Sequence, residues 1–160
     1  MDKRAAASRE LIKKAFLSLL ACKPLSELKM SELARQAGVS RSTLYAHYET
    51  PRAVFDELVD DFVARTSGLS VQLRCQDCHA PHSKAPFCEQ LRAAGPYQPL
   101  VLDSSFLAQF LHVILDDAHA EHALAPYLDT GISEGQARSM LVFQISGCYM
   151  AAVNADCNAL

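Results

Sequence analysis

Hydrophobic residues recur at helical spacing over much of the chain. In residues 5–22 they form one stripe of an amphipathic helix, made of Leu11, Ile12, Ala15, Phe16, Leu19 and Leu20. Further helices are predicted over residues 31–37, 41–48, 52–65, 104–121 and 133–155. No segment of useful length alternates with the two-residue period of a strand. The pattern therefore predicts an all-α fold.

Local signals place the boundaries of the first helices. Lys23 precedes Pro24, and a residue before proline is pushed out of the helical region, so the first helix ends there. Gly38 stands where a left-handed residue ends a helix, and Ser40 is placed to cap the next one. Thr50-Pro51 combines an N-cap residue with proline at the first helical position. A short helix, a tight turn and a second short helix are therefore expected before residue 51.

Residues 67–99 have a different composition. They hold four of the seven prolines, two of the six glycines and three of the six cysteines. This composition predicts loops broken by short turns. The segment is either disordered in part, or residues 69–74 and 87–94 supply short helices.

Residues 140–153 are apolar on nearly every side. A spanning helix needs ~20 apolar residues, so this stretch predicts no transmembrane segment. A helix that is apolar all round must be covered all round, and in a chain of 160 residues a partner subunit is the expected cover. We therefore expect a homodimer. Residues 1–10 lack an apolar signal core, so the cysteines are expected as thiols or metal ligands in a reducing cytoplasm.

Charge divides the chain into two parts. Residues 1–52 carry ten Lys and Arg against five Asp and Glu, a net charge of +5, whereas the remainder carries −8. At 50% hydrophobic and 21% charged residues the chain is too apolar for a disordered protein. The basic first third indicates a local footprint for an anionic partner such as nucleic acid.

The two short helices match the plan of a helix-turn-helix. Ala34 and Ala37 are small enough to let the helices approach, and Gly38 permits the sharp turn. Residues 41–48 contain one leucine, Leu44, among side chains that form hydrogen bonds. A helix anchored by so small an apolar base can present its polar face to DNA.

The motif Ala-Gly-Val-Ser-x-x-x-Leu-Tyr-x-His-Tyr over residues 37–48 resembles the signature of the TetR/AcrR regulators. The resemblance extends over about residues 8–63. It implies a three-helix DNA-binding head over residues 1–50 and a connecting helix over residues 51–66. A short, divergent helical domain over residues 67–160 would then dimerise and bind a small molecule.

The resemblance also implies roles for single residues. Arg41, Ser42 and Thr43 would face base edges, and Arg41 could pair with guanine through two hydrogen bonds. Tyr45 and His47 would contact phosphates, which fix the register without reading sequence. Tyr48 would pack against the first helix.

The chain departs from the family pattern at two positions. Lys29 stands where a capping threonine is common; a lysine can reach a phosphate but cannot cap. Pro51 replaces a lysine at the start of the connecting helix, and Arg52 is expected to substitute for it as a DNA contact. Both departures concern contacts to phosphate.

Residues 75–88 concentrate possible metal ligands. Cys75 and Cys78 have the spacing of a zinc-binding pair, and His82 and Cys88, or His79, could complete four ligands. The alternatives are a thiol redox switch and a loop without a special role. A second candidate row, His112, Asp116 and His119, would share the polar face of the predicted helix 104–121 and is more typical of a solvated face. No cofactor other than zinc is indicated.

No arrangement of residues typical of catalysis occurs, so an enzyme is not expected. The sequence predicts a cytoplasmic transcriptional repressor that binds a palindromic operator as a dimer, is released by an unknown small-molecule effector and has no membrane partner. Two alternatives remain. One is a coactivator of the same fold that does not bind DNA, and the other is a zinc- or redox-responsive regulator that uses the Cys75–Cys88 loop.

Overall fold

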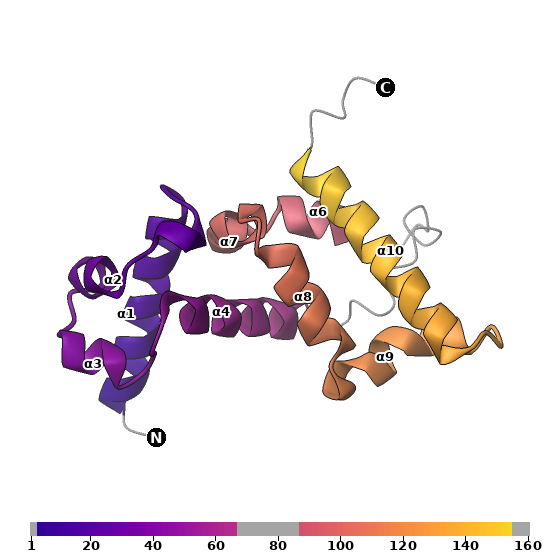
Figure 1. Ribbon diagram of the computed structural model, residues 1–160, viewed down its shortest axis with the longest axis horizontal. Coiled ribbons are helices and arrows are strands. Elements are labelled where there is room, and N and C mark those ends of the chain that lie inside the picture. Colours follow the sequence, from indigo (N-terminus) through magenta and orange to yellow (C-terminus); the bar gives the residue numbers. More distant parts are fainter. Residues whose placement is uncertain (1–2, 67–86, 155–160) are drawn as a thin grey trace.

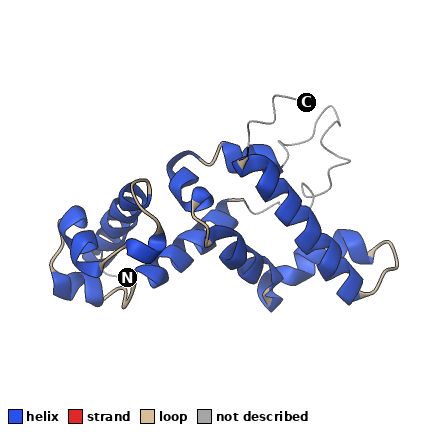
Figure 2. Ribbon diagram, turned by 45° about the horizontal axis from the view of Figure 1, so that its top comes forward, coloured by secondary structure: helices blue, strands red, loops and turns tan. Residues whose placement is uncertain are grey.

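Figure 1 shows the computed structural model of the chain, which describes residues 3–66 and 87–154. Every element in these two stretches is helical, with nine α-helices and two 3-10 helices (Figure 2). The predicted all-α class is therefore confirmed. The helices form a small N-terminal head and a larger body, joined by α4 (Figure 1).

The head, which we define as residues 3–50, is built around α1. Its elements are α1 (Lys3–Leu20), η1 (Leu25–Glu27), α2 (Met30–Ala37) and α3 (Arg41–Tyr45). Ile12 and Phe16 of α1 are fully buried, and so is Leu44 of α3. Removing such side chains from water is the main favourable contribution to packing these short helices.

Helix α4 (Pro51–Arg65) runs from the head into the body and packs against both α1 and α8 (Figure 1). It begins as expected: the hydroxyl of Thr50 accepts from the N–H of Ala53, and Pro51 occupies the first turn. The buried residues of α4 cover more than one side of the helix, namely Val54, Phe55, Leu58, Val59, Phe62 and Val63. One helix thus continues the hydrophobic core from the head into the body.

The body surrounds the far half of α4. Its elements are α6 (Phe87–Arg92), η3 (Gly95–Tyr97), α7 (Gln98–Leu102), α8 (Phe106–Leu115), α9 (Asp117–Leu128) and α10 (Glu134–Val153). Aromatic rings fill its centre. Phe110 stacks on Phe87 and Phe106 at centroid distances of 5.3 and 5.4 Å, and Phe62 brings α4 into the same cluster. Offset and edge contacts of this kind stabilise beyond the area they bury.

Two predicted boundaries are wrong. The single helix expected over residues 104–121 is two helices, because the backbone at Asp116 is extended (φ −65°, ψ 146°). The third helix ends at Tyr45 rather than at residue 48. The short helix offered as an alternative over residues 87–94 is present as α6, and Phe87 and Leu91 of this helix are buried. Residues 69–74 lie outside the described ranges.

Among the described helices, no single one is long and apolar enough to cross a membrane. Residues 95–102 and 106–115 meet the length and composition test only as a pair, and that pair is bent by 103°.

Candidate nucleic-acid interface

The turn between α2 and α3 is formed by Gly38 in the left-handed conformation (φ 66°, ψ 27°). A side chain at this backbone geometry is strained, so glycine is the favoured residue. The next residue, Val39, donates its N–H to the carbonyl of Ala34. The backbone therefore reverses direction within two residues, as the sequence predicts.

Ser40 is the N-cap residue of α3. Its hydroxyl oxygen accepts from the N–H of Thr43 at 3.1 Å, which satisfies one of the free donors of α3. The same hydroxyl lies 2.9 Å from the hydroxyl of Ser42 and 2.8 Å from that of Thr43. The cap and two of the predicted base-reading side chains thus form one hydrogen-bonded group.

The inner side of α3 is held by few apolar contacts. Leu44 has no exposed surface, and Ala34 and Ala37 of α2 are buried. Tyr48 is buried as expected, and the guanidinium of Arg9 lies 5.8 Å from the centre of its ring. The remaining side chains of α3 are therefore free to face outward.

The outer side of α3 is polar. Arg41, Ser42 and Tyr45 are exposed and Thr43 is half-buried, as is His47, which follows the helix. Tyr45 is 54% exposed although it is aromatic, and nothing in the described residues packs over it enough to bury it. An exposed tyrosine on a polar helix face suits contact with a phosphate backbone.

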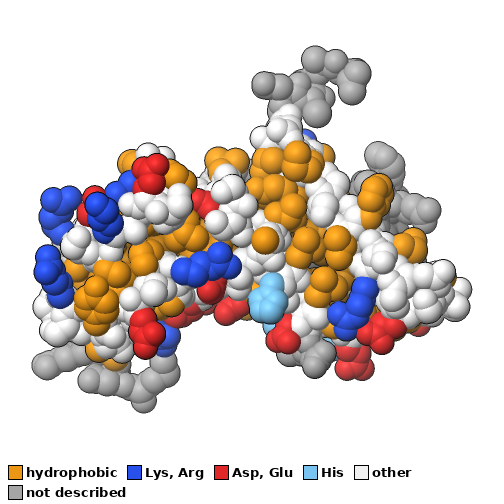
Figure 3. Space-filling view, in the orientation of Figure 1, with side chains coloured by type: hydrophobic (Ala, Val, Ile, Leu, Met, Phe, Trp, Pro, Cys, Tyr) orange, Lys and Arg blue, Asp and Glu red, His pale blue; other side chains and the backbone are white. Residues whose placement is uncertain are grey.

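Basic side chains gather at the end of the molecule formed by α2 and α3 (Figure 3). Lys29, Arg35 and Arg41 are all exposed there. Lys29 is the N-cap residue of α2 and makes no capping hydrogen bond through its side chain, in line with the departure noted in the sequence.

Arg35 belongs to this surface but was not among the predicted contacts. It lines, with Ser31 and Arg41, a shallow cleft of about 400 Å³ between α2 and α3. The sequence placed Arg35 only on the outward face of α2. Its proximity to Arg41 depends on how the turn folds α2 onto α3.

Arg52 is already bound within the chain. Its Nε donates to Asp56 at 2.6 Å, its Nη2 donates to Gln109 of α8 at 2.6 Å, and its guanidinium lies over the ring of Phe55. A phosphate would have to displace these partners. For Arg52 to contact DNA, these hydrogen bonds would have to break. This cost does not arise for Lys29 or Arg41.

Ion pairs fix α4 against α1. Arg9 and Lys13 both bind Glu57, at 2.9 and 2.7 Å, and Lys13 also binds Asp61 at 2.6 Å. Burial disfavours the charge of Glu57, yet hydrogen bonds, first from Lys13, hold its pKa below the ordinary value. Burial likewise opposes the charge of Lys13, but Asp61 and Glu57 raise its pKa.

The predicted zinc ligands Cys75, Cys78 and His82, together with His79, lie outside the described residues. Cys88 is described: it sits half-buried in α6 and packs against the hydrophobic core. Within residues 3–66 and 87–154, no three His, Cys, Asp or Glu side chains are grouped as metal ligands.

The row of His112, Asp116 and His119 required one continuous helix. The break at Asp116 separates α8 from α9, so the three residues do not share a helical face. The prediction of a second metal site at these three residues is therefore wrong.

The head matches known proteins in sequence. Residues 11–58 match the bacterial regulatory proteins of the tetR family. Over 73 residues the chain is 27% identical to YdgC, an uncharacterized HTH-type transcriptional regulator of Bacillus subtilis (strain 168). That match covers 46% of this chain and 37% of the Bacillus protein. No solved structure matches the chain significantly.

The matched residues are those that build the geometry described above. They include all of α2, the Gly38 turn, α3 and the first half of α4. The family consists of DNA-binding regulators rather than enzymes. Through this helix-turn-helix head, the chain is similar to the TetR family of transcriptional regulators.

Proposed function

We propose that the chain is a dimeric repressor that binds a palindromic operator in the cytoplasm and is released by a small molecule. The observation that carries this proposal is the exposed polar face of α3, held from behind by Leu44 and Tyr48. Such a helix can enter the major groove without exposing its apolar base.

The proposed contacts fall into two groups. Arg41, Ser42 and Thr43 read base edges, and among them only the guanidinium can form two hydrogen bonds with one guanine. Lys29, Tyr45, His47 and Arg35 contact phosphates, which position the head without reading sequence. Arg52 joins the second group only if it leaves Asp56 and Gln109.

The dimer is proposed to form through α10. One side of this helix is buried in the body, through Ala137, Leu141, Ile145, Tyr149 and Ala152. The other side exposes Met140, Phe143 and Met150, and hydrophobic side chains are visible along α10 at the surface (Figure 3). Phe143 is 83% exposed. A second copy of α10 would remove these side chains from water.

A dimer also supplies the geometry that a palindrome demands. Two heads reach successive major grooves when half-sites are ~34–36 Å apart. A small molecule that favours another arrangement of the body would change the separation of the heads through α4, which packs against both parts. The identity of that molecule is left open by this proposal.

The test is selection of bound fragments from a random duplex library, followed by anisotropy titration at ~50 mM salt. We expect enrichment of an inverted repeat and much weaker binding to unrelated duplexes. Arg41→Ala in the same selection should lose preference at one position in each half-site. Equal, weak binding to all duplexes would contradict the proposal.

A second candidate is a coactivator of the same fold that does not bind DNA. It is favoured by Arg52, whose guanidinium is occupied by Asp56 and Gln109, and by Lys29, which cannot cap α2. No binding to any duplex, even at ~50 mM salt, would support this candidate over the repressor.

A further inference from the structure

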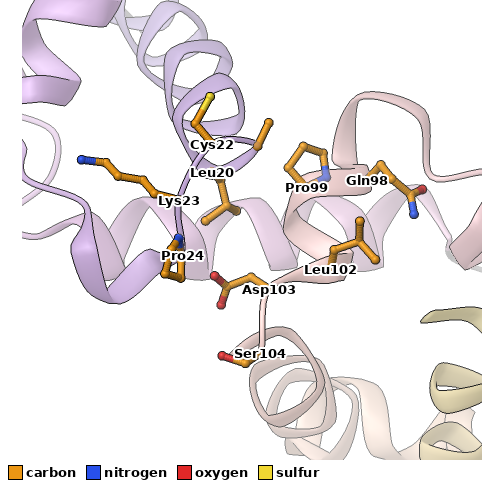
Figure 4. A pocket seen from close by; sticks show the side chains of 10 residues that line it. Leu20, Cys22, Lys23, Pro24, Gln98, Pro99, Leu102, Asp103 and Ser104 are labelled. Carbon is orange, nitrogen blue, oxygen red and sulfur yellow. The ribbon is translucent and has the colours of Figure 1, made fainter. Parts of the chain in front are cut away.

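Asp103 is the one charged side chain among the described residues that is buried, with 6% of its surface exposed. It lies in the turn between α7 and α8, on the side of the body that faces the head (Figure 4). Burying a carboxylate is costly unless it is hydrogen-bonded. Its position therefore calls for partners that compensate the burial.

Both carboxylate oxygens have backbone partners, and these lie in different parts of the molecule. Oδ1 accepts from the N–H of Ser105 at 2.9 Å, which closes the turn that leads into α8. Oδ2 accepts from the N–H of Leu25 at 2.9 Å, in η1 of the head. One side chain thus joins the backbone of the head to the backbone of the body.

The packing around this contact is incomplete. A cleft of about 530 Å³ separates the end of α1 from α7, lined on the head side by Leu20, Cys22 and Pro24. Pro99 and Leu102 line it on the body side, and the carboxylate of Asp103 points toward Pro24 (Figure 4). The Asp103 contact beside this cleft therefore acts together with α4 in holding the head on the body.

We propose that Asp103 is a positioning residue that sets the orientation of the DNA-binding head on the body. Without its carboxylate the N–H of Leu25 loses its partner, and the apolar contacts between α1 and α7 remain as a surface on which the head can shift. In a dimer, the orientation of each head decides which half-site separation both heads can reach. The inference therefore deepens the proposed function and rests on it.

The variant that isolates this role is Asp103→Ser. A serine hydroxyl can still accept from the N–H of residue 105, since serine forms the same kind of turn more weakly. Its side chain is too short to keep the hydrogen bond from Leu25. Asp103→Ala removes both hydrogen bonds and serves as the stronger variant.

Tyr149→Phe is the matched control. Tyr149 is buried, and its hydroxyl donates to the carbonyl of Val101 at 3.1 Å, a contact that stays inside the body. This variant loses one buried hydrogen bond without touching the head. All three variants are first compared with the wild type by circular dichroism, and the measurements are made below the lowest melting temperature.

The first measurement is hydrogen exchange of the peptide covering residues 21–29. Asp103→Ser should speed exchange at Leu25 about tenfold or more, while α2 and α3 keep wild-type rates. Tyr149→Phe should leave this peptide unchanged. Wild-type exchange at Leu25 in Asp103→Ser and Asp103→Ala would overturn the inference.

The second measurement uses the operator selected by the wild type and the same operator lengthened by one or two base pairs between its half-sites. The wild type should prefer the selected spacing, and Asp103→Ser should bring the affinity ratio close to one. An unchanged ratio together with faster exchange would also overturn the inference, since Asp103 would then hold η1 without setting the orientation of the head.

The two arms separate this inference from the proposed function. If the wild type selects no operator, the proposed function fails and the exchange arm alone decides whether Asp103 holds the head. If it selects one and the spacing preference of Asp103→Ser is unchanged, the proposed function stands and the inference fails. Restoration of the preference by Asp103→Glu, whose longer carboxylate can reach Leu25, would add support.

Discussion

Arg41 is the side chain on the outer face of α3 with the greatest capacity to distinguish bases. Its guanidinium is exposed, and a planar fork of donors matches the two acceptors of guanine in the major groove. The hydroxyls of Ser42 and Thr43 are hydrogen-bonded to that of Ser40. Because a hydroxyl can donate or accept, these two residues discriminate less between bases. Base preference should therefore depend most on one residue.

We expect Arg41→Ala to weaken binding to the selected operator by about 1–3 kcal/mol and to relax preference at one base pair per half-site. Competition titrations with operators changed at single positions measure both effects. A uniform drop in affinity for every duplex would show that Arg41 contacts phosphate instead.

Lys29→Ala provides the matched comparison. Loss of a phosphate contact should weaken binding about equally across sequences and lower the slope of log affinity against log salt by about one. Base preference should stay that of the wild type.

Glu57 gives the stability of the head a dependence on pH. Its pKa in the folded chain lies below its ordinary value near 4.5, so its ionised form stabilises the fold above that pH. At pH 7 we expect Glu57→Gln to lower the free energy of unfolding by about 1–2 kcal/mol, because Arg9 and Lys13 lose a charged partner.

The difference between Glu57→Gln and the wild type should shrink as the pH falls below about 4.5, where the glutamate becomes protonated and neutral as well. Urea denaturation at pH 7, 5 and 3.5 measures it. A difference that stays constant over this range would mean that Glu57 acts through packing rather than charge.

At the scale of elements, the Gly38 turn decides how α3 is presented. A Cβ at residue 38 would meet no atom within 4 Å, so the cost of Gly38→Ala is the strain of a positive φ alone. We expect a loss of about 1–2 kcal/mol in stability and weaker operator binding, because the angle between α2 and α3 would change.

Gly131 offers a control for this strain. It has a φ of 81° in the turn between α9 and α10, where an added Cβ would likewise meet no atom within 4 Å, and it lies far from the recognition helix in the chain. Gly131→Ala should cost similar stability and leave operator affinity unchanged. Equal losses of affinity in the two variants would indicate a global effect instead of a turn effect.

Elements with local signals were predictable. Gly38, Ser40 and Thr50 each act on backbone groups within four residues, and the structure confirms all three. The break at Asp116 has no proline or glycine beside it, so the hydrophobic periodicity predicted one continuous helix across this position. A helix over residues 87–94 was left as one of two alternatives, and the helical residues 95–102 were missed, because this region packs against Phe62 and Phe110 from distant elements.

The whole molecule depends on contacts that no local pattern reveals. Leu25 and Asp103 are 78 residues apart, and Arg52 and Gln109 are 57 apart. The sequence predicted α3 as a candidate binding surface because its polar face and its anchor belong to one short segment. It could not predict Arg35 beside Arg41, Arg52 bound to α8, or Asp103 beneath the head.

Self-association is a prediction at the scale of the whole molecule. Phe143→Asp places a charge at the most exposed aromatic position of α10 and should convert a dimer to a monomer at micromolar concentration. Sedimentation or light scattering measures this. Leu11→Asp changes a leucine of α1 that is 51% exposed and should leave the mass unchanged. A dimer that persists in Phe143→Asp would show that the interface lies elsewhere.

Helix α4 has a consequence for how the protein unfolds. Its buried side chains, from Val54 near the head to Phe62 among the aromatic rings of the body, belong to one hydrophobic core that continues from the head into the body. Neither part of this core is complete without α4. We therefore expect head and body to melt together in a single cooperative transition, so a destabilising change in the body would also lower the fraction of chains able to engage DNA.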